Sequence, residues 1–300
     1  MQAVANRPAI GIAWMIVTGM LFVGVTAVVK HVGDALPAAQ SAFLRYVLGL
    51  VFLIPMIRPI LAARLTRRQL GLFGARGAVH TLGVMLWFFA MTEITIAEVT
   101  AMNYLSPVYV TLGAALFLGE RLALRRLLAV AAALAGAMII LRPGFRELSP
   151  GHVAMLGTAL FFGASYLLAK LLSGETRPAV IVGMLSMTVT VGLAPFAAAV
   201  WVTPTWGQLG WMFVVACLAT AGHSTMTLAF AAAPVTVTQP VTFLQLLWSV
   251  LLGALIFAEP VDGWVVLGGL VILASVTFIT WREAVVRRRP VTPNVNATKL

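Results

Sequence analysis

The sequence has little charge and almost no cysteine. Charged residues make up 10% of the 300 residues, whereas an ordinary soluble protein carries about a quarter. The hydrophobic fraction is 61%, so too few polar side chains remain to cover the surface of a soluble fold. A single cysteine, Cys217, excludes a disulfide framework and a cysteine-rich metal site. The composition therefore indicates a protein whose solvent is lipid.

Acidic residues are scarcer than basic ones, with 9 Asp and Glu against 20 Lys and Arg. This balance is compatible with nucleic acid as well as with a membrane. The basic residues lie between apolar runs, which favours the membrane and argues against a nucleic-acid partner. The first run, residues 8–29, is longer than a signal-peptide core and lacks a clear cleavage site, so we expect a retained span.

Apolar runs long enough to cross a bilayer follow one another along the chain. A helix needs about 20 apolar residues for roughly 30 Å of hydrocarbon, and a barrel strand only about 10 alternating ones. The sequence therefore predicts an all-α polytopic membrane protein. Its ten predicted spans are residues 8–29, 39–57, 69–91, 96–117, 123–141, 150–172, 178–202, 207–230, 236–257 and 262–281.

Basic residues are distributed unequally between the two ends of these spans. With the N-terminus in the cytoplasm, most of the arginines fall on the cytoplasmic side, and the opposite side keeps Lys30, Arg142 and Arg146. Lys and Arg resist translocation, so this asymmetry places both termini in the cytoplasm.

The chain also repeats itself at a shift of 139 residues. Five helices per copy is an odd number, so the second copy enters the membrane from the opposite side, and inverted repeats are typical of alternating-access carriers. We place the first repeat at 1–146, the second at 147–282 and a basic, polar cytoplasmic tail at 283–300. The aligned pairs are Thr81 with Thr220, Gly83 with Gly222, Ala90 with Ala229, Leu105 with Leu244 and Glu120 with Glu259.

Residues 90–141 resemble the first EamA repeat of the drug/metabolite transporter superfamily, and residues 231–274 are similar to its paired repeat. The second copy departs from the pattern, because Phe243 and Leu246 stand where the family usually has Tyr and Pro. The resemblance implies ten helices around a central cavity and metabolite export across a bacterial inner membrane. Size and pattern are also similar to exporters of aromatic and other amino acids. The features that carry the first match are Ala97, Ala101, Tyr104, Ser106, Pro107, Gly119, Glu120 and Gly136.

Polar and aromatic side chains within the spans are candidates for solute binding, since such groups are costly in lipid and favour an inward position. An aromatic solute would gain from stacking on Trp and Tyr. Each candidate has an alternative role in packing or in bridging helices. The candidate substrate-binding residues are His80, Trp87, Asn103, Tyr104, Tyr166, His223, Gln245 and Trp248.

Two charged residues lie at a similar depth below the outer ends of their spans. An unpaired charge there is costly, so we expect Arg45 and Glu98 to form an ion pair, as a structural strut or as an outer gate. No buried chain of acidic residues is visible, and a passive carrier and a proton-coupled antiporter both stay open. If protons are coupled, His80 and Glu98 are the residues to test.

The sequence thus predicts a carrier that exports small metabolites, most directly amino acids including aromatic ones, by alternating access. The alternatives are export of another solute, such as a drug, a nucleoside or a cofactor, and, less favoured, an intramembrane enzyme or a channel. No catalytic motif is present, so we expect a non-enzyme with no catalytic residues, no metal and no cofactor. The expected partners are a small-molecule solute and the lipid bilayer.

Overall fold

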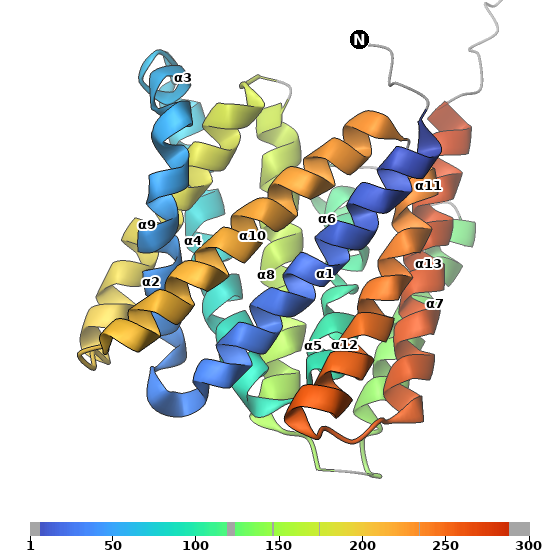
Figure 1. Ribbon diagram of the computed structural model, residues 1–300. Coiled ribbons are helices and arrows are strands. Elements are labelled where there is room, and N and C mark those ends of the chain that lie inside the picture. The colour runs from blue at the N-terminus through green and yellow to red at the C-terminus, as the bar shows by residue number, and fades with distance from the viewer. Residues whose placement is uncertain (1–6, 119–123, 146, 174, 234, 288–300) are drawn as a thin grey trace, which may run out of the picture.

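The computed structural model describes residues 7–118, 124–145, 147–173, 175–233 and 235–287, which fold into a bundle of helices (Figure 1). The long helices are α1 (Pro8–Val32), α2 (Ala38–Gly49), α4 (Arg67–Glu93), α7 (Leu124–Leu141), α8 (Pro150–Ser173), α9 (Pro178–Ala199), α10 (Trp206–Ala232), α12 (Phe243–Phe257) and α13 (Gly263–Arg287). The short segments are η1 (Gly33–Ala35), η2 (Leu50–Met56), α3 (Ile57–Leu61), α5 (Ile96–Asn103), α6 (Ser106–Leu118), α11 (Val235–Thr238) and η3 (Gln239–Thr242).

The predicted all-α membrane fold is confirmed. In the described part of the chain, nine helical stretches are long and apolar enough to cross a membrane. The broken segment α5–α6 occupies the remaining predicted span, 96–117. The last helix continues to Arg287, so the chain is still helical where we placed the start of the tail at 283.

Two of the predicted spans are interrupted rather than continuous. The fourth divides into α5 and α6 at Tyr104 and Leu105, just before Pro107. The ninth begins with α11 and η3, which contains Pro240, before α12 starts at Phe243. Proline has no backbone N–H and disfavours the helical conformation at the preceding residue, which explains why regular helix stops near both prolines.

One long helix of each repeat, α4 in the first and α10 in the second, begins and ends at equivalent positions. Arg67–Glu93 and Trp206–Ala232 are both 27-residue helices, and the second begins 139 positions after the first. Each is preceded by the same capping box, Thr66 with Gln69 and Thr205 with Gln208, which satisfies two otherwise unpaired groups at the helix start. The shift of 139 residues found in the sequence is therefore also present in the helix starts.

Helix packing follows the same internal symmetry (Figure 1). α4 of the first repeat packs along α8 of the second, and α1 of the first packs along α10 of the second, while α2 contacts α9 and α7 contacts α13. The α7–α13 contact is close because glycines face each other: a Cβ added at Gly136 would lie 2.8 Å from the Gly268 carbonyl oxygen. Small residues at such contacts let helix backbones approach in lipid.

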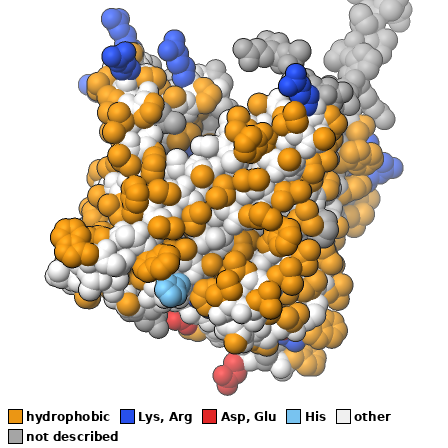
Figure 2. Space-filling model, in the orientation of Figure 1, with side chains coloured by type: hydrophobic (Ala, Val, Ile, Leu, Met, Phe, Trp, Pro, Cys, Tyr) orange, Lys and Arg blue, Asp and Glu red, His pale blue; other side chains and the backbone are white. Residues whose placement is uncertain are grey.

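The chain enters and leaves the bundle at the same end, where α1 begins and α13 ends (Figure 1). Lys and Arg side chains are visible at that end, and hydrophobic side chains are spread over much of the face formed by α1 and α10 (Figure 2). Ile10, Val17 and Met20 of α1 are among the exposed apolar residues. This surface suits contact with lipid. We refer to the end with the chain termini as the basic end and to the other as the far end.

Candidate functional site

A chain of hydrogen bonds passes through a buried histidine between three helices. His80 on α4 has Nδ1 3.1 Å from Oγ of Ser165 on α8 and Nε2 3.2 Å from Oη of Tyr46 on α2. The ring of Phe162 stacks on the imidazole, with the ring centroids 4.8 Å apart. Because both ring nitrogens have partners, the imidazole is held in one orientation. His80 thus joins α2, α4 and α8.

Aromatic side chains continue from this histidine along α4 and α8. The rings of Trp87 and Tyr166 lie with their centroids 6.0 Å and 6.3 Å from that of Phe162. Trp87 Nε1 is buried and has no hydrogen-bond partner among the described residues, whereas Tyr166 is 46% exposed. Three predicted site residues, His80, Trp87 and Tyr166, therefore surround Phe162, and we call these four residues the aromatic cluster.

The contact between α1 and α10, which corresponds to the contact between α8 and α4, has a similar pair of a phenylalanine and a histidine. Phe22 on α1 stands 140 positions before Phe162, and its ring lies 5.1 Å, centroid to centroid, from that of His223 on α10. The hydroxyls of Thr18 and Thr225 are 2.9 Å apart between the same two helices. His223 is exposed, unlike His80. This predicted site residue thus belongs to the contact between α1 and α10.

Hydrogen bonds join the two helix breaks. Tyr104, at the end of α5, donates its hydroxyl to the carbonyl oxygen of Thr242, just before α12, at 2.8 Å. The hydroxyls of Thr100 and Ser249 lie 2.7 Å apart between the same helices. Asn103 Oδ1, beside the first break, is buried and has no partner in the part of the chain that the structure describes. Broken helices of this kind form the solute and ion sites of many membrane carriers.

The remaining predicted residues lie on α12, away from the aromatic cluster. Gln245 packs on α1, because a Cβ added at Gly19 would lie 3.3 Å from the Cβ of Gln245. Trp248 Nε1 is buried without a partner among the described side chains and backbone. Within the described ranges, no hydrogen bond or ring contact joins either residue to the cluster. That Gln245 and Trp248 bind the same solute as the aromatic cluster therefore stays a prediction.

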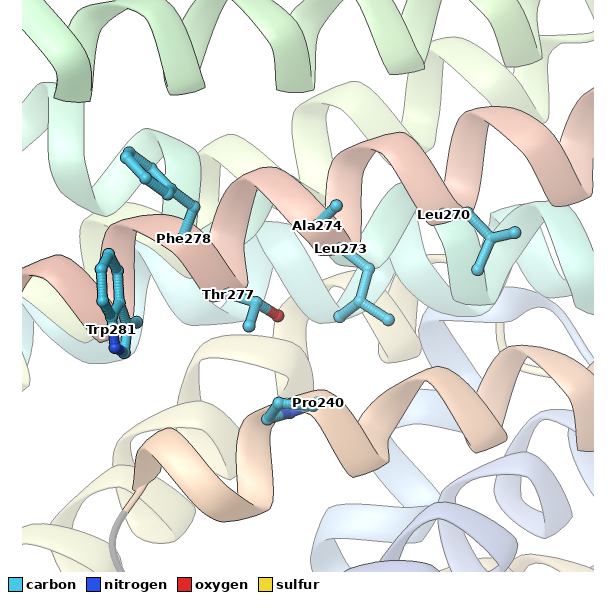
Figure 3. Close-up of a pocket in the computed structure, with 7 residues that line it drawn as sticks. All are labelled: Pro240, Leu270, Leu273, Ala274, Thr277, Phe278 and Trp281. Carbon is cyan, nitrogen blue, oxygen red and sulfur yellow. The ribbon is translucent and has the colours of Figure 1, made fainter.

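Two cavities lie along α13. One, of about 370 Å³, is lined by α6, α8 and α13, with Tyr166 and Thr111 in its walls and Arg126 and Lys170 as its basic residues. The other, of about 540 Å³, lies between α13 and Pro240. Figure 3 shows Leu270 and Leu273 of α13 extending toward Pro240. The second cavity is apolar and contains no predicted site residue, so the first suits a polar solute better.

The expected ion pair between Arg45 and Glu98 is not formed. The Arg45 guanidinium carbon lies 4.1 Å from the centroid of the Tyr46 ring. Glu98 accepts a hydrogen bond from the backbone N–H of Thr95 at 2.9 Å and lies 3.1 Å from Nε2 of His152. It closes the capping box that starts α5, which holds its carboxylate at the first turn. Similar depth in the membrane did not imply contact, because Arg45 lies on α2 and Glu98 on α5, and these two helices do not pack closely against each other.

A different ion pair lies at the far end of the bundle. Lys30 Nζ, at the end of α1, lies 2.5 Å from Oε1 of Glu259 and donates to the carbonyl oxygen of Ile94 at 2.7 Å. The other oxygen of Glu259 accepts from the backbone N–H of Ile96 at 3.0 Å. Sequence reasoning missed this pair, although both residues stand at span ends on the same predicted side. The carboxylate connects α1, α5 and the loop after α12. Glu120, the sequence counterpart of Glu259, lies outside the described residues.

Sequence reasoning also missed three polar residues around His80. Tyr46 and Ser165 are its hydrogen-bond partners. Arg76, one turn before His80 on α4, is only 7% exposed and donates from Nη1 to the carbonyl oxygen of Ile181 at 3.1 Å. The available signal was a charge within a predicted span, four residues from a histidine and therefore on the same helix face.

The described side chains offer no metal site: no group of three or more His, Cys, Asp or Glu residues among them is arranged to hold an ion. The polar groups described around the aromatic cluster and the helix breaks include hydroxyls, an amide, indoles, an imidazole and a guanidinium group. Such groups bind an organic solute through hydrogen bonds and ring contacts.

The chain matches known transporters over nearly all of its length. It is 32% identical to a riboflavin transporter of Rhizobium johnstonii over 95% of both chains. It is 27% identical to a riboflavin transporter of Vibrio cholerae over 96% of this chain and 98% of the other. It is 24% identical to a pseudopaline exporter of Pseudomonas aeruginosa over 88% and 94%. The model of the EamA-like transporter family matches residues 9–142 and 149–281, and the chain therefore belongs to this family of membrane transporters.

Proposed function

We propose that this transporter carries a small metabolite with a planar, heteroaromatic ring, and that a flavin is the first candidate. The observation that carries the proposal is a set of three buried polar atoms, Trp87 Nε1, Asn103 Oδ1 and Trp248 Nε1, which have no hydrogen-bond partner among the described residues. A flavin offers flat faces for stacking and an edge of carbonyl and ring-nitrogen groups for hydrogen bonds. The names of the two riboflavin transporters support the same solute class.

Amino acids, the solutes first predicted from the sequence, fit less well. A zwitterion carries an ammonium group, which is best neutralised by a carboxylate when water is excluded. The charged side chains described beside His80 are basic: Arg76 lies one turn before it on α4, and Arg45 lies over the ring of its partner Tyr46. Glu98 is held by Thr95 and His152 instead. The relatives named above also carry solutes other than amino acids.

Transport proceeds in this proposal by alternating access of the two repeats. The Lys30–Glu259 ion pair closes the far end. Toward the basic end, Tyr166 is exposed and lines the cavity that contains Arg126 and Lys170. We assign this conformation as open toward the basic end. Exchange with the opposite state requires Lys30 and Glu259 to separate, and matched halves make such an exchange nearly symmetric.

We place the protein in the inner membrane of a bacterium with both termini in the cytoplasm. The bacterial relatives support the membrane, and the arginines at the basic end support the orientation. Export stays the predicted direction. The repeat boundary at residues 146 and 147 is part of the same proposal.

Uptake into proteoliposomes tests the solute. Purified protein is reconstituted, and initial rates are measured for labelled riboflavin, phenylalanine and uridine over a range of concentrations. We expect saturable uptake of riboflavin, inhibited by an excess of unlabelled riboflavin, and no saturable uptake of phenylalanine. Saturable phenylalanine flux without riboflavin flux, from protein that is monodisperse before reconstitution, would return the assignment to amino acids.

A further inference from the structure

Arg76 is a buried cation whose hydrogen-bonding capacity is only partly used. Its side chain is 7% exposed, and Nη1 donates to the backbone carbonyl of Ile181. Its Nε is buried without a partner in the part of the chain that the structure describes. A guanidinium has five N–H donors in a fixed plane, so most of this capacity is available to an acceptor. Uncompensated charge at membrane depth is costly and marks functional positions.

Arg45 provides a second guanidinium near the same histidine. It is half-buried on α2 and stacks on the ring of Tyr46, whose hydroxyl is bonded to His80. Arg76 lies one turn before the same histidine on α4. Two arginines from different helices thus flank the Tyr46–His80–Ser165 chain.

Acidic side chains do not neutralise these arginines. Among the described residues, neither Arg45 nor Arg76 has a carboxylate within ion-pair distance. Three of the carboxylates that do form ion pairs with lysine or arginine lie at the ends of the bundle, as Lys30–Glu259, Arg68–Glu175 and Arg142–Asp262. The region around His80 therefore combines two cations with no compensating anion among the side chains that the structure describes.

We propose that Arg45 and Arg76 form an anion-binding subsite beside the aromatic cluster, which binds the charged oxygens of a carboxylate or phosphate group on the solute. This inference rests on the proposed function, because it assigns the polar end of the same solute. The guanidinium plane of Arg76 suits two oxygens of one anionic group, since paired N–H donors match carboxylate and phosphate geometry. The same charges disfavour cationic solutes.

Two flavins that differ in charge test the subsite. Riboflavin and riboflavin 5′-phosphate share the ring, so the difference in their affinities isolates the anionic group. Binding to the full chain in nanodiscs is measured by quenching of flavin fluorescence. We expect the phosphate form to bind about tenfold more tightly or better, as one or two charge-assisted hydrogen bonds allow. Equal or weaker binding of the phosphate form would overturn the proposal.

Substitutions assign the effect to the arginines. Arg45→Gln and Arg76→Gln are each expected to remove most of the preference for the phosphate form. Arg76→Lys retains the charge and is expected to retain part of the preference. Arg58→Gln makes the same chemical change at an exposed position on α3 and is the control. If Arg45→Gln, at the half-buried position, is folded and keeps the full preference, the subsite is wrong.

Anions without a ring separate this proposal from the flavin assignment. Thermal stability of the purified protein is measured in inorganic phosphate, in acetate and in chloride at equal ionic strength. Stabilisation of the wild-type protein, but not of Arg45→Gln, by phosphate or acetate would support the subsite even if neither flavin binds. The anion that stabilises the protein more, phosphate or acetate, identifies the charged group that the subsite binds. If neither flavin binds and no anion stabilises the protein, the subsite is overturned.

Discussion

The hydroxyl of Tyr104 donates a hydrogen bond to the carbonyl oxygen of Thr242, at 2.8 Å, and so connects the two broken spans. Tyr104 stands at the end of α5, and Thr242 immediately precedes α12. Regular helix stops at both positions, which leaves backbone groups that need other partners. One side chain of the first repeat therefore satisfies a free carbonyl group of the second.

Removal of this hydroxyl should weaken coupling between the repeats. Tyr104→Phe deletes a hydrogen bond worth about 1 kcal/mol and leaves a buried carbonyl unsatisfied. We expect solute uptake to fall several-fold while the protein remains folded, as size-exclusion chromatography will show. Tyr109→Phe, on the neighbouring helix α6, makes the same change outside the break and should have little effect. Equal losses in the two variants would argue against a special role for Tyr104.

Disruption of the far-end ion pair should open that end of the protein. Lys30→Gln and Glu259→Gln each break the Lys30–Glu259 contact. We expect thiol reagents added from the far side to label a cysteine placed in the aromatic cluster faster in both variants. In a double-mutant cycle the two changes should be coupled by about 1 kcal/mol or more. Additive effects would show that the pair does not close this end.

The glycine contact between α7 and α13 gives a prediction on stability. In Gly136→Ala the new Cβ would meet the Gly268 carbonyl oxygen at 2.8 Å, so the two helices must move apart. We expect a loss of about 1–3 kcal/mol in stability, typical of overpacking. Gly71→Ala, in α4, meets no atom within 4 Å and should gain stability slightly. Thermal unfolding followed by dye labelling of Cys217 measures both.

A surface ion pair gives a prediction on pH dependence. Arg68 of α4 donates a hydrogen bond, at 2.7 Å, to the carboxylate of Glu175, which lies in the loop between α8 and α9. This hydrogen bond lowers the pKa of Glu175 below its usual 4.5. Because the pKa of Glu175 is lower in the folded than in the unfolded protein, its carboxylate stabilises the fold at any pH above the unfolded-state pKa. This stabilisation is lost as the pH falls through the folded-state pKa. The difference in melting temperature between wild type and Glu175→Gln should therefore be small but present at pH 7 and disappear in strong acid. Glu147→Gln, at another exposed position, should show no such trend.

Because Arg45 and Glu98 do not form the ion pair predicted from the sequence, their substitutions are no longer expected to be coupled. Arg45 stacks on Tyr46 and Glu98 contacts His152, so the two residues have different neighbours among the described residues. We expect the effects of Arg45→Ala and Glu98→Ala on transport to add within about 0.5 kcal/mol. A strongly non-additive double variant would show that the two residues do pair during the cycle.

The sequence predicted the ten segments and their inverted repetition well, because both depend on the length and order of apolar runs. It also predicted the common face of His80 and Trp87, which both contact Phe162. It did not predict which side chains meet across helices. The pairing of Lys30 with Glu259, and of His80 with Tyr46, depends on helix rotation and tilt, which hydropathy does not determine.

Counterflow in proteoliposomes tests the central claim, a carrier with an aromatic solute site, most directly. Liposomes are preloaded with unlabelled riboflavin, and entry of labelled riboflavin is followed with wild type, with Trp87→Ala and with Trp206→Ala, a control at an exposed position. The account predicts transient accumulation of label above equilibrium for wild type and Trp206→Ala, and a several-fold smaller overshoot for Trp87→Ala. Flux that does not saturate and is unaffected by the preloaded solute would contradict it.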